Sequence, residues 1–295
     1  MRLRLFAPVL CLLVAAPSSG WTEAPSVATP PAPVWPQAGA PLVAPEVTFP
    51  KGMKRLRVYL DAGHGAARNT GNTSCTCEQE QDFTLRISQE LARRLEATGH
   101  FQVRLSRDAE TQVSYPDRLK EAEGWKTDVF VSIHSDARGQ ATLALAADGK
   151  LCPRREGAPG FSVLWSDEGE PALTARRHAL ARILSRRLVA AGFPAYDGSD
   201  YTGLYDGDAQ PGVFVDRRPL AKRVFVLRRP TMPSIIIETH HAFDPEEVAR
   251  WTEARTLDVF AATVASALVE LWSGEQPGVT GVTTSKGVIK SNLIQ

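Results

Sequence analysis

The chain lacks an excess of charge of either sign, since 34 Lys and Arg stand against 33 Asp and Glu, a formal net charge of +1. No bulk field therefore favours nucleic acid or acidic lipid, and we expect no nucleic-acid partner. Aromatic residues are few, at 7%, but hydrophobic residues make up 43% and charged residues 23% of the 295 positions. This is the balance of a globular protein with a full core. It excludes a disordered, collagenous or coiled-coil chain.

Long hydrophobic runs are scarce, and one of them opens the chain. Arg2 and Arg4 precede an apolar stretch from Leu5 to Ala16, which small residues follow. This pattern predicts a cleaved signal peptide over residues 1–20. The stretch is too short to span a bilayer as a mature helix, and we expect no transmembrane segment in the mature chain. We therefore predict a periplasmic or secreted protein.

Cysteine is rare. After removal of residues 1–20, Cys75, Cys77 and Cys152 remain. In an oxidising compartment we expect one disulfide that joins Cys152 to Cys75 or to Cys77, because a bond between Cys75 and Cys77 would close a very small, strained ring. The sequence offers no fourth ligand at the spacing of a zinc knuckle, so a structural disulfide is the preferred interpretation.

Proline, in contrast, is concentrated. Eight prolines lie between residues 21 and 50, which predicts an extended linker over residues 21–53. Residues 274–295 are rich in Gly, Thr, Ser and Lys, and we interpret them as a flexible tail. One catalytic domain is predicted between them, over residues 54–273.

This domain alternates between short apolar runs and helical patterns. The runs predict strands over residues 56–60, 101–105, 128–133, 161–165, 224–227 and 234–237, and the helical patterns cover 82–98, 116–123, 173–191 and 244–271. The alternation predicts a single α/β domain with a central, mostly parallel twisted sheet of about six strands flanked by helices. Two stretches, 138–160 and 194–223, are longer than plain connections, and a substrate-gripping rim, a regulatory cover and unrelated loops all remain open for them.

Titratable side chains follow three of these strands. His64 comes after the first strand, His134 ends the third and Glu238 ends the last. Because the carboxyl ends of parallel strands share one edge of a sheet, we expect these side chains to lie close together. Glu80 precedes the first helix, which begins near the same edge, and Glu78 is an alternative for that position.

A histidine after a strand is more often a structural residue than a ligand, but the coincidence at one edge favours a metal site. Two histidines, one glutamate and an open water position form a known catalytic zinc arrangement. Zinc lowers the pKa of bound water towards about 7, and a further carboxylate can then move protons. Glu238 suits this role because it directly follows an apolar run. Partial burial of its carboxyl group there would raise the pKa of Glu238. For His240 and His241 we favour loop positions or substrate contacts over metal ligands.

Four sequence blocks resemble the zinc-dependent N-acetylmuramoyl-L-alanine amidases of bacterial cell division and sporulation. These blocks are Val58–Gly65, Glu80–Leu85, Val129–Ala137 and Met232–Thr239, in the order of that family. The resemblance implies a zinc ion on His64, Glu80 and His134, which selects Glu80 over Glu78, with Glu238 as the catalytic residue. One departure is His240–Asp244, where the family usually has Gly-Phe and an Asn, and it concerns the substrate wall rather than the zinc ligands.

The reaction that the resemblance implies is hydrolysis of the amide between N-acetylmuramic acid and the L-alanine of the peptidoglycan stem peptide. Peptidoglycan is then the substrate, and dependence on an activator protein stays open. One alternative is a related zinc amidohydrolase or carboxypeptidase that acts on soluble muropeptides. Another is a homologue that binds peptidoglycan without cleaving it. The presence of all four key residues favours an enzyme.

Overall fold

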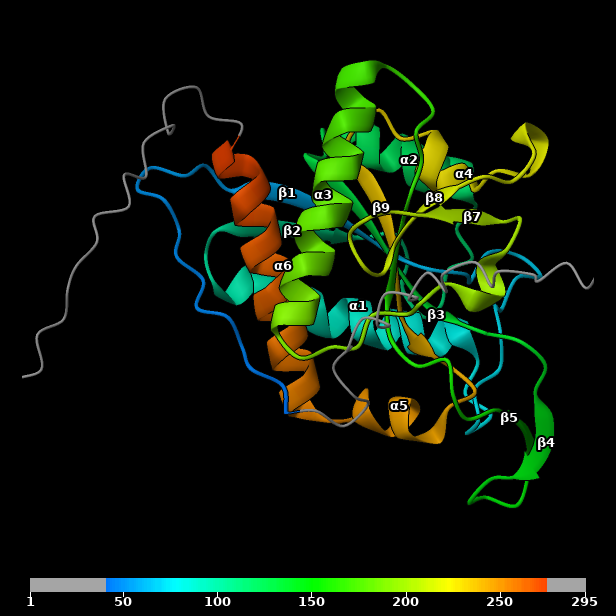
Figure 1. Cartoon of the computed structure of the whole chain (residues 1–295). Helices are drawn as coiled ribbons and strands as arrows, with labels where there is room; N and C mark the ends of the chain where they lie inside the picture. The colour runs from blue at the N-terminus through cyan, green and yellow to red at the C-terminus, as the bar shows by residue number, and fades with distance from the viewer. Residues whose placement is uncertain (1–40, 275–295) are drawn as a thin grey trace, which may run out of the picture. The chain divides into compact units, whose positions relative to one another are not determined.

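The computed structural model describes residues 41–274, which are built around a seven-stranded sheet (Figure 1). Its strands are β1 (Leu56–Ala62), β2 (Phe101–Leu105), β3 (Val129–Asp136), β6 (Ser162–Trp165), β7 (Tyr205–Gly207), β8 (Val213–Asp216) and β9 (Ser234–His241). They lie in the order β2-β1-β3-β9-β6-β8-β7. The predicted signal peptide and, apart from Gly274, the predicted tail lie outside the described residues.

The direction of the strands confirms a mostly parallel sheet. Strands β2, β1, β3 and β9 pair in parallel, as do β6 and β8, whereas β6 runs antiparallel to β9 and β7 antiparallel to β8. The carboxyl ends of β1, β3 and β9 therefore meet at one edge. The stretch 194–223 contributes β7 and β8, which raises the number of strands above the expected six.

One predicted strand is wrong. Residues 224–227 fall largely within the short helix α4 (Phe225–Arg228) instead. Val226 and Leu227 of this helix are buried with Met232 against one face of the sheet. A four-residue apolar run satisfies a buried helical turn as well as a strand, and its periodicity cannot separate the two.

Helices cover both faces of the sheet. They are α1 (Glu80–Ala97), α2 (Tyr115–Gly124), α3 (Pro171–Ala190), α4, α5 (Pro245–Arg250) and α6 (Ala254–Gly274). Val58 and Leu60 of β1 belong to a hydrophobic cluster with α1, α3 and α6, whereas Tyr59 between them packs with α2 and α4 on the other face. This alternation of side chains is what a strand buried on both faces requires.

The predicted helical region 244–271 forms two helices, α5 and α6. Asp244 caps α5, because its Oδ1 accepts hydrogen bonds from the backbone N–H groups of Glu246 and Glu247. By length and hydropathy α6 is able to cross a membrane, but most of its apolar window is buried in the domain, where it packs beside α3 and α1. That burial is typical of a core helix.

Residues 21–40 of the predicted linker lie outside the described residues, whereas its remaining part, residues 41–53, contacts the domain. Leu42 is buried in the core, and its carbonyl accepts a hydrogen bond from Arg255. The backbone N–H of Val43 donates to the carbonyl of Ala191. The segment has no regular secondary structure, as its prolines predict, but an extended chain can still bury apolar side chains.

The stretch 138–160 contains an antiparallel hairpin of β4 (Thr142–Leu145) and β5 (Leu151–Arg154), which projects from the body of the domain (Figure 1). A disulfide joins Cys152 in β5 to Cys77, whereas Cys75 is free. This is one of the two pairings that the sequence left open. The bond ties the hairpin to the loop that leads into α1.

We predict that Leu42→Ala lowers the free energy of unfolding by about 2 kcal/mol, since it removes a buried side chain from the core. Val43→Ala is the matched control, because the Val43 side chain is exposed, and its effect should stay within about 0.5 kcal/mol. Urea unfolding of the two variants measures both values. Equal effects of the two substitutions would show that the segment does not contribute to the core.

Candidate metal centre and active site

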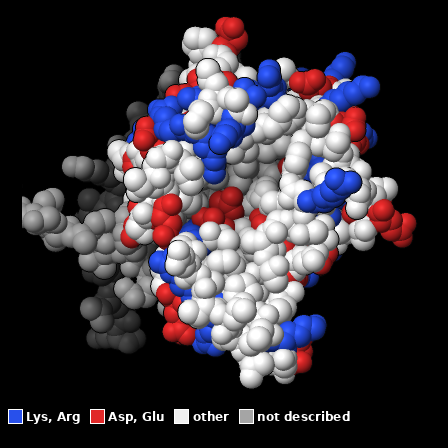
Figure 2. Space-filling model, turned by 90° about the vertical axis from the view of Figure 1, so that its right-hand side faces the viewer, with Lys and Arg blue, Asp and Glu red and all other residues white. Residues whose placement is uncertain are grey.

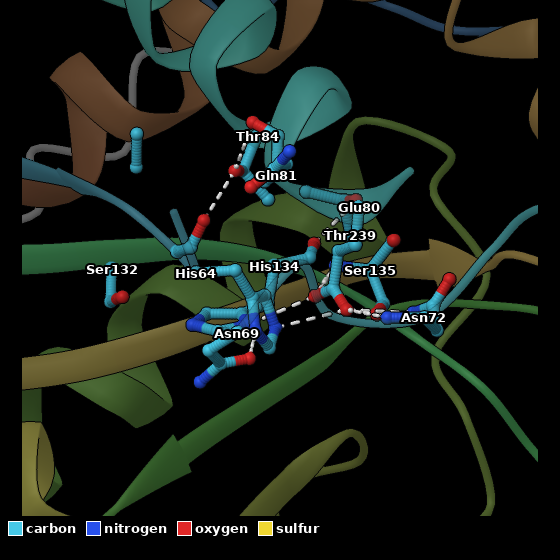
Figure 3. Close-up of polar contacts among 12 residues, drawn as sticks. His64, Asn69, Asn72, Glu80, Gln81, Thr84, Ser132, His134, Ser135 and Thr239 are labelled. Carbon is cyan, nitrogen blue, oxygen red and sulfur yellow. Dashed lines mark hydrogen bonds and ion pairs between the residues drawn. The ribbon is translucent and has the colours of Figure 1, made fainter. Parts of the chain in front are cut away.

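His64, Glu80 and His134 converge at the carboxyl edge of the sheet (Figure 3). His64 follows β1, Glu80 is the first residue of α1 and His134 lies near the end of β3. One ligand atom from each side chain lies within 4.8 Å of the others. The carboxylate of Glu80 lies between the two rings, with Oε2 3.0 Å from His64 Nε2 and Oε1 3.0 Å from His134 Nδ1.

The ring of His64 is held by its other nitrogen. Nδ1 lies 2.7 Å from Oδ1 of Asn69, and the amide nitrogen of Asn69 donates to the hydroxyl of Tyr115 at 2.8 Å. When Nδ1 of the neutral ring donates to this amide oxygen, Nε2 carries a lone pair, which a metal ion would take in place of the direct contact with Glu80. His64 also has a φ of +61°, an uncommon backbone conformation that is often found at functional sites.

Glu80 is buried and accepts hydrogen bonds from the protein besides its two histidine contacts. Asn72 donates to Oε2 from its backbone and its side chain, at 3.0 and 2.8 Å, and the backbone N–H of Ser135 donates to Oε1 at 3.1 Å. Burial raises the pKa of Glu80, but the hydrogen bonds and charges of His134 and His64 outweigh it and hold the pKa below its usual range. The group is therefore a carboxylate at neutral pH, as a metal ligand must be.

Two glycines make room for this cluster. A Cβ atom at Gly63 would lie 2.4 Å from Nε2 of His134, and one at Gly71 would lie 2.5 Å from Oε2 of Glu80. Gly71 also has a φ of +77°, which L side chains rarely adopt. The loop between β1 and α1 can therefore approach the ligands only with glycine at these positions.

The donor set fits a zinc ion. Two imidazole nitrogens and one carboxylate oxygen are the protein ligands of a known catalytic zinc arrangement, with a further position left for water or substrate. The ring nitrogen of His64 that faces away from Glu80 has a hydrogen-bond partner in Asn69, as metal-binding histidines usually do. The coordination implied by the sequence therefore agrees with the geometry of these three side chains.

A buried ion pair supports the turn that carries His64. Arg118 and Asp61 have fully buried side chains, and Nη1 of Arg118 donates to Oδ1 of Asp61 at 2.8 Å. The other Nη of Arg118 donates to the carbonyl of His64, and Ser132 donates to Asp61. Burial raises the pKa of Asp61, but the charge of Arg118 and these hydrogen bonds hold it below its usual range.

Sequence reasoning did not find the residues that position the ligands, among them Asn69, Asn72, Arg107 and Arg118. Arg107 donates to the carbonyls of Ala62 and Gly63. These side chains lie in loops and in a short helix. In such segments the sequence alone does not distinguish a polar residue that positions a ligand from one that is exposed to solvent. The asparagines flank His64 and Glu80 closely in sequence, and this was the one available signal.

Glu238 lies directly beside His134, because the two residues are partners in the β3–β9 register. Its side chain is partly buried, and Oε2 has no hydrogen-bond partner among the described residues. Burial and the nearby carboxylates of Asp136 and Glu80 raise the pKa of Glu238 well above its usual value.

Figure 2 shows a hollow in one face of the domain, with acidic side chains at its base and basic side chains nearby.

The substrate contacts expected for His240 and His241 stay a prediction, and both side chains are buried. Strand β9 continues through residue 241, so these side chains enter the interior instead of a loop. The ring of His240 packs against Phe83 and Trp251, and burial lowers its pKa to about 3. His241 donates its backbone N–H to Glu247.

A family model described as N-acetylmuramoyl-L-alanine amidase matches residues 58–270. The chain belongs to this amidase family. Among curated amidases, it is 28% identical over 226 residues to AmiA of Salmonella typhimurium, which covers 66% of this chain and 68% of AmiA. It is 24% identical over 257 residues to the probable amidase AmiB of Haemophilus influenzae, covering 81% of this chain but only 55% of AmiB. The chain thus spans about half the length of that relative.

A comparison with solved structures agrees with these sequence matches. The crystal structure of the amidase Ami1 from Mycobacterium smegmatis superposes with a TM-score of 0.57 at 20% identity, covering 76% of this chain and 99% of Ami1. The single α/β domain with its mostly parallel sheet is therefore the amidase fold.

We predict that Asn69→Ala weakens zinc binding by roughly ten-fold, because it releases the ring of His64. Tyr115→Phe removes only the outer hydrogen bond to Asn69, so its effect should be smaller. Competition with a fluorescent zinc chelator measures both affinities, with circular dichroism to verify the fold. Unchanged affinity in Asn69→Ala would separate Asn69 from the metal site.

Proposed function

We propose that the chain is a secreted zinc hydrolase that cleaves the amide between N-acetylmuramic acid and the L-alanine of peptidoglycan stem peptides. The observation that carries the proposal is the convergence of His64, Glu80 and His134 beside Glu238 in a chain of the amidase family. The names of the curated relatives, which are N-acetylmuramoyl-L-alanine amidases, support the substrate.

His64, Glu80 and His134 would hold the zinc ion, and the bound ion would polarise the amide carbonyl and acidify water. Glu238 would accept the proton of the attacking water and deliver it to the departing alanine nitrogen. Burial and the nearby carboxylates of Asp136 and Glu80 raise its pKa, which makes it a stronger base for that proton than an exposed glutamate. Its Oε2, which has no hydrogen-bond partner within residues 41–274, would take that proton.

Secretion is supported by two features of the chain. The pattern of residues 1–20 is that of a signal peptide. The disulfide between Cys77 and Cys152 is typical of proteins that mature in an oxidising compartment. A periplasmic or extracellular location would also bring the enzyme to its peptidoglycan substrate.

We predict that Glu238→Gln lowers the rate of amide cleavage on the order of 10²-fold or more while zinc remains bound, because the amide cannot shuttle the proton. Glu110→Gln is the matched control, since Glu110 is exposed. Purified peptidoglycan is digested with the zinc-loaded chain, and mass spectrometry identifies the released products. Free stem peptides that begin at L-alanine, and their loss with a chelator, are the expected result.

Other products would contradict the proposal. If intact peptidoglycan remains uncut while soluble muropeptides are cleaved, the alternative of a muropeptide hydrolase replaces it. If zinc binds and neither substrate is cleaved, the chain is a peptidoglycan-binding homologue without this activity. Full activity of Glu238→Gln would remove Glu238 from the mechanism.

A further inference from the structure

An arginine in the stretch 194–223 is held in place next to the candidate active site. Arg218 follows β8, and its guanidinium lies over the ring of Tyr205 in β7, 4.2 Å from the centroid. Its Nη1 and its backbone N–H both donate to Oδ1 of Asp216, at 3.3 and 3.1 Å. Its carbonyl accepts a hydrogen bond from Arg223 at 3.0 Å. Side chain and backbone are therefore both fixed.

The charge of Arg218 is less fully neutralised than that of the neighbouring arginine. Arg217 forms ion pairs with two acidic side chains, Asp167 and Asp206. Arg218 forms one within the described part of the chain, a single 3.3 Å contact of one nitrogen with Asp216. The side chain of Arg218 remains 24% exposed, whereas that of Asp216 is 1% exposed. A guanidinium has five N–H donors, and the contacts with Asp216 and Tyr205 use only part of them, so donor groups are left for a ligand from solvent.

A series of side-chain contacts leads from this guanidinium to Glu238. The ring of Tyr205 packs on that of Tyr201, with centroids 4.7 Å apart, and the hydroxyl of Tyr201 donates to Oγ of Ser162 at 3.2 Å. Ser162 is the partner of Glu238 in the β6–β9 register. Burial raises the pKa of Glu238, and the charge of Arg218 acts on the same carboxylate in the opposite direction.

We infer that Arg218 binds a carboxylate of the stem peptide, on the alanine side of the cleaved amide, and so favours substrates in which that group is free over those in which it is amidated. The inference rests on the proposed function. A planar guanidinium presents paired donors that match the two oxygens of a carboxylate. Tyr205 and Asp216 fix it before binding, so little side-chain freedom is lost.

The carboxylate can come from either of two residues of the stem peptide. One is the glutamate that follows L-alanine, and the other is a third residue that carries an acidic side chain. Two pairs of synthetic N-acetylmuramoyl tripeptides separate them. The first pair has the glutamate α-carboxyl free or amidated before a lysine amide, and the second pair has an amidated glutamate before diaminopimelate whose side-chain carboxyl is free or amidated.

The experiment measures kcat/KM of the zinc-loaded chain, residues 21–295, on these four substrates. We expect a preference for the free acid in one pair, on the order of 10- to 100-fold and expressed mainly in KM. Arg218→Gln should reduce this ratio to about one, and Arg218→Lys should retain part of it. Arg217→Gln, which removes a neighbouring positive charge, should leave the ratio unchanged.

The possible results separate this inference from the proposed function. Equal rates on both members of both pairs, or a preference that persists in Arg218→Gln, would overturn the role of Arg218 and leave the amidase activity standing. A preference that Arg217→Gln abolishes equally would assign it to general charge, against this inference. Failure to cleave all four substrates and intact peptidoglycan would overturn the proposed function, and this inference with it.

Discussion

The contacts of Glu80 with His64 and His134 are the constraint on which the rest of the site depends. A buried carboxylate is costly unless it is paired and hydrogen-bonded. Here two imidazoles satisfy it together with donors from Asn72 and Ser135. The same contacts draw the start of α1 to the ends of β1 and β3. The donor set needed for a divalent cation is therefore assembled by the fold itself.

The surrounding strands and a buried ion pair hold the site residues in position. The parallel pairing of β1, β3 and β9 brings His64, His134 and Glu238 to one edge. The buried pair of Arg118 and Asp61 fixes the turn after β1, and breaking such a pair by removing one partner typically costs about 3–5 kcal/mol. Loss of either partner would therefore destabilise the turn that carries His64.

The sequence predicted that His64, His134 and Glu238 lie at one edge of the sheet because their positions follow from a general rule, whereas the choice of Glu80 came from the family resemblance. These residues follow β1 or lie near the carboxyl ends of β3 and β9, and parallel strands bring such positions to one edge of the sheet. Sequence reasoning was weaker where tertiary packing decides. Residues 224–227 are apolar enough for a strand but form a helical turn under the sheet. His240 has the polarity of a loop residue, yet it is buried because β9 extends past Glu238.

Contacts between residues that are distant in the sequence likewise could not be predicted from local sequence patterns. Nothing near Leu42 in the sequence shows that Arg255 donates a hydrogen bond to its carbonyl and holds this segment on the domain. The role of Arg118 depends on Asp61, which lies 57 residues away. The pairing of Cys152 with Cys77 instead of Cys75 depends on where the β4–β5 hairpin lies. In each case the partner is fixed by the tertiary fold.

The most direct test of this account is a crystal structure of the zinc-loaded chain with anomalous diffraction measured at the zinc absorption edge. The account predicts one strong anomalous peak, bound by Nε2 of His64, Nδ1 of His134 and a carboxylate oxygen of Glu80, with Glu238 beside it and not a ligand. A zinc ion bound elsewhere, or coordinated by Glu238 in place of Glu80, would contradict it.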